Sequence, residues 1–282
     1  MNKSGLNIEE IRPIIDYALK EDIGSGDITT NSLIPLDLQA RATMVAKSTG
    51  IIAGLAIAEY VFRTLSNDIT WKTFVNDGDK VSKGDLILEI SGSYRALLTG
   101  ERVALNFMQR MSGIATMTAN YVAELKDFKT KILDTRKTVP GLRLMDKYAV
   151  MAGGGTNHRI GLYDMVLIKD NHIKIAGGIT NAVAQIKKNV PAGIKIEVET
   201  TSIEEVREAL AASVDIIMLD NMSNSTMAES VKLINGRAKV EASGNMTIER
   251  LKQVAATGVD YISIGMLTHS VAAFDISMNI ES

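Results

Sequence analysis

The second half of the chain alternates short β-branched runs with helical patterns, and this alternation constrains the fold more than any other feature. The runs are KILDTR (131–136), DMVLIKD (164–170), IKIEVET (194–200), DIIMLDN (215–221), KVEASG (239–244) and DYISIGM (260–266). The intervening segments include SIEEVREALAAS, in which Ser202 and Glu205 form a capping-box pattern. Strands that alternate with helices predict βαβ units and a parallel sheet. Six units favour a β/α barrel, although periodicity alone leaves an open sheet possible.

The first half of the chain has a different character, which changes near residue 113. Residues 70–92 contain short alternating β runs separated by turn signals at Asn76-Asp77-Gly78 and Lys83-Gly84-Asp85. This module resembles the hammerhead of biotinyl and lipoyl carrier domains, but it shows no tight hairpin that presents a lysine. We therefore favour a structural sheet over a carrier module. Residues 100–126 predict a helix with a break near Ser112-Gly113.

Composition excludes several classes of protein. The 282 residues allow one large α/β domain or two domains. A net charge of −2 gives no long-range attraction to nucleic acid, and no uncharged apolar stretch is long enough to span a membrane, so we expect a cytoplasmic protein. The lack of cysteine rules out disulfides and thiolate sites, and three histidines make a zinc site improbable. The GxxxxGK(S/T), GxGxxG and GxSxG motifs are absent.

Polar residues end each of the six predicted strands. They are Arg136-Lys137, Lys169-Asp170, Glu199, Asp220, Ser243-Gly244 and Gly265. In a parallel barrel the carboxyl ends of the strands meet on one face, where binding sites are built. Six polar strand ends in register therefore predict a functional site at this face.

The cations of this predicted face indicate a substrate with several negative charges. They are Arg136, Lys137, His158, Arg159 and Lys169, with Arg102 as a further candidate from the preceding helix. Arginine and lysine suit carboxylate and phosphate groups. Arg143 and Lys147, on the following helix, are expected to be solvated surface charges.

The carboxylates and glycines of this face indicate a metal and a phosphate. Glu199 and Asp220 end adjacent runs and are candidates to hold Mg²⁺ beside phosphates or to stabilise positive charge on a substrate. Structural pairing with neighbouring cations is the alternative for both. Ser243-Gly244 and Gly265 predict a phosphate-binding loop, because small residues let an anion approach backbone N–H groups.

Longer motifs carry a resemblance to a known family. The strings ERVALNFMQRMSGIAT, LDTRKTVPGLR, GGGTNHRIGLYDMVLIKDNH, EVET, LDN, EASGN and SIGMLTHS, together with EDIGSGDITT near the start, resemble quinolinate phosphoribosyltransferases in order and spacing. The resemblance covers about residues 10–275. The sequence departs mildly at Asn245-Met246, where the family often has glycine and then an aliphatic residue.

The resemblance implies an α/β fold of the type II phosphoribosyltransferase kind, with two domains. An N-terminal α/β sandwich would comprise residues 1–113, joined by the C-terminal segment 269–282. An incomplete six-stranded parallel β/α barrel would comprise residues 114–268. It also implies a homodimer, open to further assembly into a hexamer, in which each N-terminal domain covers the barrel mouth of the other subunit.

The resemblance further implies a pentosyltransferase that converts quinolinate and phosphoribosyl pyrophosphate to nicotinate mononucleotide, with Mg²⁺ as cofactor. Lys137, Glu199 and Asp220 would be catalytic, and Glu199 and Asp220 would face the ribose and Mg²⁺. The implied substrate-binding residues are Arg102, Arg136, Lys137, His158, Arg159, Lys169, Glu199, Asp220, Ser243, Gly244, Gly265 and His269. The competing activities are a related nicotinate or molybdenum-transport-associated phosphoribosyltransferase and a silent barrel that senses phosphorylated metabolites.

Overall fold

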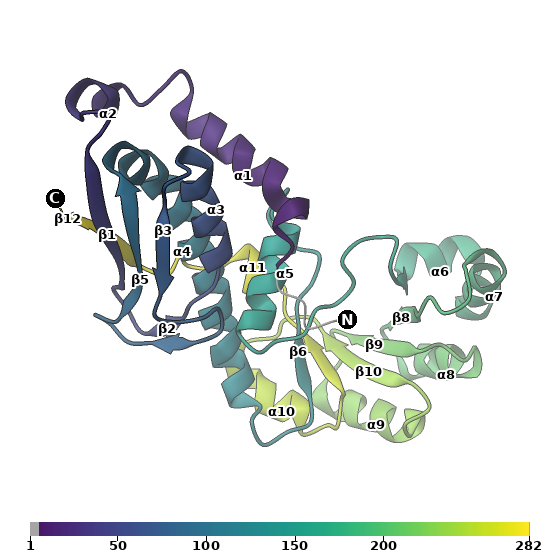
Figure 1. Ribbon diagram of the computed structural model, residues 1–282. Coiled ribbons are helices and arrows are strands. Elements are labelled where there is room, and N and C mark those ends of the chain that lie inside the picture. Colours follow the sequence, from purple (N-terminus) through teal and green to yellow (C-terminus); the bar gives the residue numbers. More distant parts are fainter. Residues whose placement is uncertain (1–5, 282) are drawn as a thin grey trace. The chain divides into compact units, whose positions relative to one another are not determined.

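The computed structural model describes residues 6–281, which divide into two compact units (Figure 1). The first unit contains the chain up to Ala119, the segment Thr138–Gly154, and the chain from Leu267 onward. The second unit contains Asn120–Lys137 and Gly155–Met266. The chain therefore passes between the units several times, and the domain boundary after residue 113 stays a prediction.

The first unit is built on a four-stranded antiparallel sheet. Its strands are β1 (Gln39–Ala46), β3 (Thr70–Thr73), β5 (Leu86–Ser93) and β12 (Ile276–Glu281), in the order β12-β1-β5-β3. The short strands β2 (Gly50–Ile51) and β4 (Lys80–Val81) form a separate antiparallel pair. In β1 the side chains of Ala42, Met44 and Ala46 are buried in alternation, as expected for a strand with one face on a core.

Six helices lie wholly or mostly in the described part of the first unit. They are α1 (Ile8–Ile23), α2 (Ile28–Leu33), α3 (Leu55–Leu65), α4 (Tyr94–Glu124), α5 (Arg143–Ala152) and α11 (Met266–His269). Asn7 caps α1 by accepting a hydrogen bond from the backbone N–H of Glu9. Ile11, Ile15 and Leu19 repeat at the helical period and are all buried.

The prediction of a helix break near Ser112-Gly113 is wrong, because α4 is continuous from Tyr94 to Glu124. Both residues serve close packing instead. The Ser112 hydroxyl accepts a hydrogen bond from the N–H of Ala53 at 3.0 Å. A Cβ atom on Gly113 would lie 2.2 Å from the carbonyl oxygen of Ala272, so only glycine lets the C-terminal segment approach the helix this closely.

The prediction of solvated charges on the helix after residue 142 is wrong for Lys147, which is 1% exposed. The neighbouring Asp146 is also buried, and it accepts hydrogen bonds from Arg110 at 2.9 and 2.8 Å. Arg143 is half-buried and donates to the Thr138 hydroxyl. The face of α5 that carries Asp146 and Lys147 therefore turns inward, which charge alone did not indicate.

The second unit contains the predicted parallel sheet, with a strand at each of the six predicted runs. The strands are β6 (Lys131–Leu133), β7 (Val166–Ile168), β8 (Ile196–Thr200), β9 (Ile216–Asp220), β10 (Lys239–Ser243) and β11 (Tyr261–Ser263). Their order is β6-β11-β10-β9-β8-β7, and every pairing is parallel. Together with the antiparallel sheet of the first unit, this sheet confirms the predicted fold class.

Helices join the strands of the parallel sheet. They are α6 (Asp170–Ala176), α7 (Ile179–Asn189), α8 (Ile203–Ala211), α9 (Asn224–Ile234), the short 3₁₀ helix η1 (Ile248–Arg250) and α10 (Leu251–Ala255). Ser202 caps α8 as predicted, by accepting from the N–H of Glu205 at 3.2 Å. The Glu205 carboxylate accepts from the backbone of Thr201 rather than Ser202, so the capping box is displaced by one residue. Within residues 6–281 we find no helix with the length and apolar character needed to cross a bilayer.

We expect Gly113→Ala to destabilise the protein by about 1–3 kcal/mol, because the added methyl group overpacks against a backbone carbonyl that cannot rotate away. Urea unfolding measures this change. Asn106→Ala is the matched control, since Asn106 is exposed on the same helix and its replacement should change stability by no more than about 0.5 kcal/mol. A Gly113→Ala protein as stable as the control would show that the contact with Ala272 is not tight.

Candidate active site

The predicted strand-end residues of the parallel sheet lie at its carboxyl edge. Glu199 is on β8, Asp220 and Ser243 are the last residues of β9 and β10, and Lys169 directly follows β7. Ser243 pairs in register with Asp220, so these two residues are direct neighbours across the strands. The sheet therefore brings together carboxylates, a cation and a small hydroxyl residue that are far apart in the sequence.

Glu199 combines a carboxylate neighbour with a cationic one. Its carboxylate lies 3.6 Å from the Lys169 ammonium group, and their side chains are 18% and 49% exposed. Burial raises the pKa of Glu199, the charge of Lys169 lowers it, and the charge of Asp220 raises it further, with a net upward shift. Glu199 therefore does pair with a lysine, which was the structural alternative. However, Lys169 is half-exposed, and the carboxylate of Asp220 also acts on Glu199. Such a site favours an added cation.

Arg136 and Arg159 form the arginine part of the site. Burial lowers the pKa of Arg159, and the positive charge of Arg136 lowers it further. Arg159 also donates from Nη1 to the carbonyl of Met165 at 3.0 Å. Two neighbouring arginines favour a ligand with more than one negative charge.

Gly244 lies in a tight turn after β10. Its φ is +93°, and a Cβ atom there would lie 2.1 Å from the side-chain oxygen of Asn221. Asn221 itself adopts a left-handed conformation, with a φ of +53°, and donates from its side chain to Asp220 at 2.7 Å. The glycine is therefore required by local packing, whether or not a phosphate approaches it.

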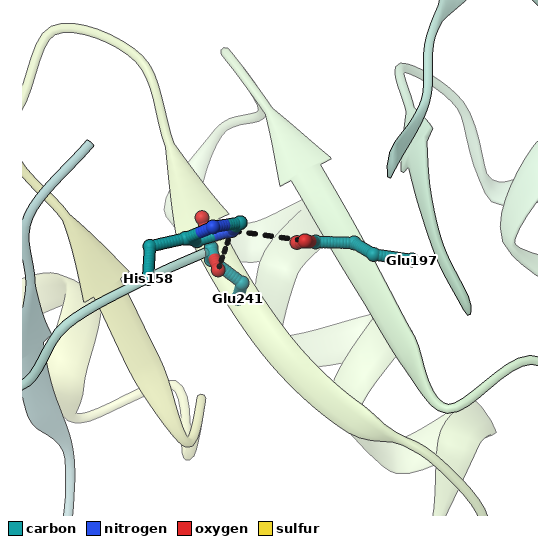
Figure 2. Close-up of side chains that lie close together, drawn as sticks. All are labelled: His158, Glu197 and Glu241. Carbon is teal, nitrogen blue, oxygen red and sulfur yellow. Dashed lines mark ion pairs between the residues drawn. The ribbon is translucent and has the colours of Figure 1, made fainter. Parts of the chain in front are cut away.

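A buried cluster lies inside the parallel sheet, formed by His158, Glu197 and Glu241 (Figure 2). The His158 Nε2 atom lies 2.9 Å from a Glu197 carboxylate oxygen and 3.4 Å from a Glu241 oxygen. The side chains are 8%, 0% and 0% exposed. His158 was predicted to bind substrate; its ring contacts two glutamates that the sequence analysis did not single out.

The backbone around His158 is also fixed. Its N–H donates to the buried carboxylate of Asp134 at 2.8 Å, just after β6. Thr156 forms a parallel bridge with Leu133, so the segment before His158 runs alongside the edge strand β6. One signal in the sequence marks the missed residues: Glu197 and Glu241 each lie between two apolar residues inside a strand run, where a charged residue needs a buried partner.

The three residues of the cluster shift the pKa values of His158 and Glu197. Burial lowers the pKa of His158, but the hydrogen bonds and charges of Glu197 and Glu241 outweigh it and raise that pKa. Burial and the charge of Glu241 raise the pKa of Glu197. The N–H of Arg159 donates to His158 Nδ1 at 2.7 Å, so the ring also contacts the backbone of the next residue.

The remaining predicted residues are more open or lie in the other unit. Lys137 is exposed and Gly265 is half-buried in the second unit. Arg102, on α4, and His269, at the end of α11, are both exposed and belong to the first unit. The second unit thus supplies most of the predicted site, and the contributions of Arg102 and His269 stay predictions.

Two family models cover nearly the whole chain. The model of the quinolinate phosphoribosyl transferase N-terminal domain matches residues 27–112, and that of the C-terminal domain matches residues 114–279. The chain belongs to the quinolinate phosphoribosyltransferase family. The resemblance read from the motifs is therefore confirmed.

Curated relatives and solved structures of the family agree with this assignment. The chain is 48% identical to quinolinate phosphoribosyltransferase (decarboxylating) 2b of Nicotiana tabacum, over 97% of this chain and 83% of that protein. It is 46% identical to the Probable nicotinate-nucleotide pyrophosphorylase (carboxylating) of Bacillus subtilis, over 98% and 95% of the two chains. The crystal structure of NadC from Streptococcus pyogenes superposes with a TM-score of 0.95 at 44% identity, over 98% of each chain.

Proposed function

We propose that the protein transfers the phosphoribosyl group of phosphoribosyl pyrophosphate to quinolinate and releases pyrophosphate and CO₂, which yields nicotinate mononucleotide for de novo NAD biosynthesis. The observation that carries this proposal is a family match over almost the full chain, joined to a sheet edge rich in cations and carboxylates. A cytoplasmic location belongs to the same proposal.

Quinolinate carries two carboxylates, which suits the paired arginines. The positive charge of Arg136 contributes to the lowered pKa of Arg159, so a dianion bound by both arginines would be stabilised. Lys169 is half-exposed and can turn from Glu199 to a substrate carboxylate. Lys137 lies between quinolinate and the ribose in this proposal, the buried His158 adjoins them through the next residue, Arg159, and Arg102 of the partner subunit completes the clamp.

The ribose reacts at its anomeric carbon. The bond to pyrophosphate breaks, the carbon becomes oxocarbenium-like, and the pyridine nitrogen of quinolinate forms the new bond with its lone pair. Glu199 and Asp220 face the ribose and stabilise the positive charge. Clamping both reactants in line can contribute roughly 7–11 kcal/mol, so no protein nucleophile is required.

The carboxylates Glu199 and Asp220 also fit Mg²⁺. They supply hard oxygen ligands, and burial together with the charge of Asp220 raises the pKa of Glu199, which supports a cation beside the two carboxylates. Glu199 and Asp220 would hold the Mg²⁺, and the ion would supply positive charge to the pyrophosphate leaving group. Ser243, Gly244, Gly265 and His269 are proposed to cradle phosphate through small side chains and N–H groups.

Decarboxylation follows from the new bond. Once the ring nitrogen is quaternary and positive, the adjacent carboxylate leaves as CO₂, and the bonding electron pair stays on the ring carbon beside that nitrogen. A proton from solvent then replaces the lost carboxylate. Lys137 is proposed to stabilise the carbanion, because its ammonium group places a mobile positive charge at this face.

The protein is proposed to form a homodimer, open to assembly into a hexamer. Large apolar side chains are exposed in both units. They are Ile28, Leu33 and Leu36 in or just after α2, Leu162 and Tyr163 shortly after Arg159, and Ile175 on α6. Each of these six is at least 72% exposed, which is unusual for side chains of this size. A second copy that packs its first unit near Arg159 would cover them and bring Arg102 to the site.

Incubation with quinolinate, phosphoribosyl pyrophosphate and Mg²⁺ should yield nicotinate mononucleotide and CO₂ in equal amounts, and chelation of Mg²⁺ should abolish both. Nicotinate serves as the control substrate. Turnover of nicotinate alone would assign the related phosphoribosyltransferase activity, and no turnover with either substrate would favour a sensor.

Arg159→Ala should raise the KM for quinolinate at least roughly 30-fold, because truncating one partner of a charge pair costs about 2–5 kcal/mol. Steady-state kinetics with each substrate varied in turn measures this effect. Arg207→Ala is the matched control, since Arg207 is exposed on α8 and away from the strand ends. An unchanged quinolinate KM in the Arg159 variant would refute the clamp.

Co-expression of Arg102→Ala and Arg136→Ala chains should restore about one quarter of wild-type activity, although each variant alone is nearly inactive. In random pairing about half of the dimers are mixed, and a shared C2 site leaves one of their two sites intact. Differently tagged chains allow the mixed dimers to be isolated and assayed. If Arg102 acted within its own chain, the mixture would stay as inactive as its parents.

A further inference from the structure

The His158 side chain connects one edge of the parallel sheet with strands further along the strand order. The segment that carries it runs beside β6, at one edge of the strand order, through the bridge between Thr156 and Leu133. Its ring nevertheless contacts Glu197 on β8 and Glu241 on β10 (Figure 2). Strand β8 is fifth in the order that begins at β6, so His158 crosses the interior of the curled sheet.

Stability alone does not explain two glutamates at these positions. Both side chains are 0% exposed. Among the described residues, the only side chain that forms an ion pair with either glutamate is His158. Removing a carboxylate from water costs several kcal/mol, and apolar side chains of similar volume often stabilise such sites more. A sheet interior that keeps both carboxylates therefore points to a role beyond packing.

The His158 ring also contacts the backbone of Arg159. Its Nε2 atom meets the glutamates, and its Nδ1 atom accepts the backbone N–H of Arg159 at 2.7 Å. The ring is thus held at both nitrogens, and one of them holds the backbone of the next residue. Any rotation of the ring releases that N–H group.

We propose that Glu197 and Glu241 are positioning residues that act through His158 to hold Arg159 in place for a substrate carboxylate. The inference rests on the proposed function for the identity of that substrate. A divalent cation held by the same three side chains is the competing explanation, because their ligand atoms lie within 4.8 Å of one another. The contact of 2.7 Å from the Arg159 N–H to His158 Nδ1 connects the cluster to Arg159, which favours the positioning role.

The kinetic test uses Glu197→Met and Glu241→Met, which keep side-chain volume and remove the acceptor. We expect the KM for quinolinate to rise at least roughly 10-fold and the KM for phosphoribosyl pyrophosphate to change less than roughly 3-fold, because a displaced clamp loses its geometry. Glu197→Gln keeps an acceptor oxygen and should stay near the wild-type KM. Val198→Ala is the control: Val198 is buried on β8 with its side chain on the opposite face of the strand.

The outcomes separate the two roles. A purely structural role would lower the yield of active enzyme and hence kcat, with both KM values unchanged, in the Met variants and in Val198→Ala alike. That pattern would overturn the proposal. So would a Glu197→Gln protein as impaired as Glu197→Met, since the acceptor would then be irrelevant.

Hydrogen exchange tests the contact without any activity. The amide of Arg159 should be protected in the wild type and should exchange at least roughly 10-fold faster in both Met variants, because its acceptor ring is no longer held. Unchanged protection would overturn the proposal, and this holds even if the protein does not act on quinolinate. Elemental analysis completes the test: a stoichiometric metal that is lost in Glu197→Met and retained in Glu199→Gln would establish the cation site instead.

Discussion

The interior of the parallel sheet holds carboxylates that water does not reach, and the position of His158 and Arg159 depends on how these groups are neutralised. Asp134, Glu197 and Glu241 are each 0% exposed. Each ion removed from water must meet a donor, or the fold loses several kcal/mol. His158 meets all three, with its backbone N–H on Asp134 and its ring on the glutamates. Arg159 follows His158 directly, so its backbone is fixed by the same contacts.

Two glutamates on strand β8, Glu197 and Glu199, differ in burial and therefore in what they can bind. Glu197 and Glu199 are two residues apart on β8, so their side chains share a face. The side chain of Glu197 is 0% exposed and contacts the enclosed His158 ring, whereas that of Glu199 is 18% exposed and contacts the half-exposed Lys169. The first contact cannot exchange with solvent, and the second can. One strand thus offers a fixed carboxylate for positioning and an exchangeable one for a substrate or a metal.

The sequence could predict the strands and the residues at their ends, because β-branched runs are local and parallel strands must align their carboxyl ends. It could not predict partners that meet only in three dimensions. Glu197 and Glu241 were treated as parts of strand runs, and nothing local connects either of them to His158. Gly113 was taken for a helix break, although it makes room for Ala272. Lys147 was taken for a surface charge, although tertiary packing buries it.

The incomplete closure of the sheet explains why the cations lie where they do. Strands β6 and β7 are the two edges of the sheet, and a closed barrel would pair them through backbone hydrogen bonds. Here the segment from Thr156 to Met165 begins beside β6 and ends just before β7. Its side chains take over part of the closure: His158 crosses to β8 and β10, and Arg159 donates to the carbonyl of Met165. A seam covered by side chains, rather than by a strand ladder, can present guanidinium groups to a ligand and still be held in place from inside the sheet.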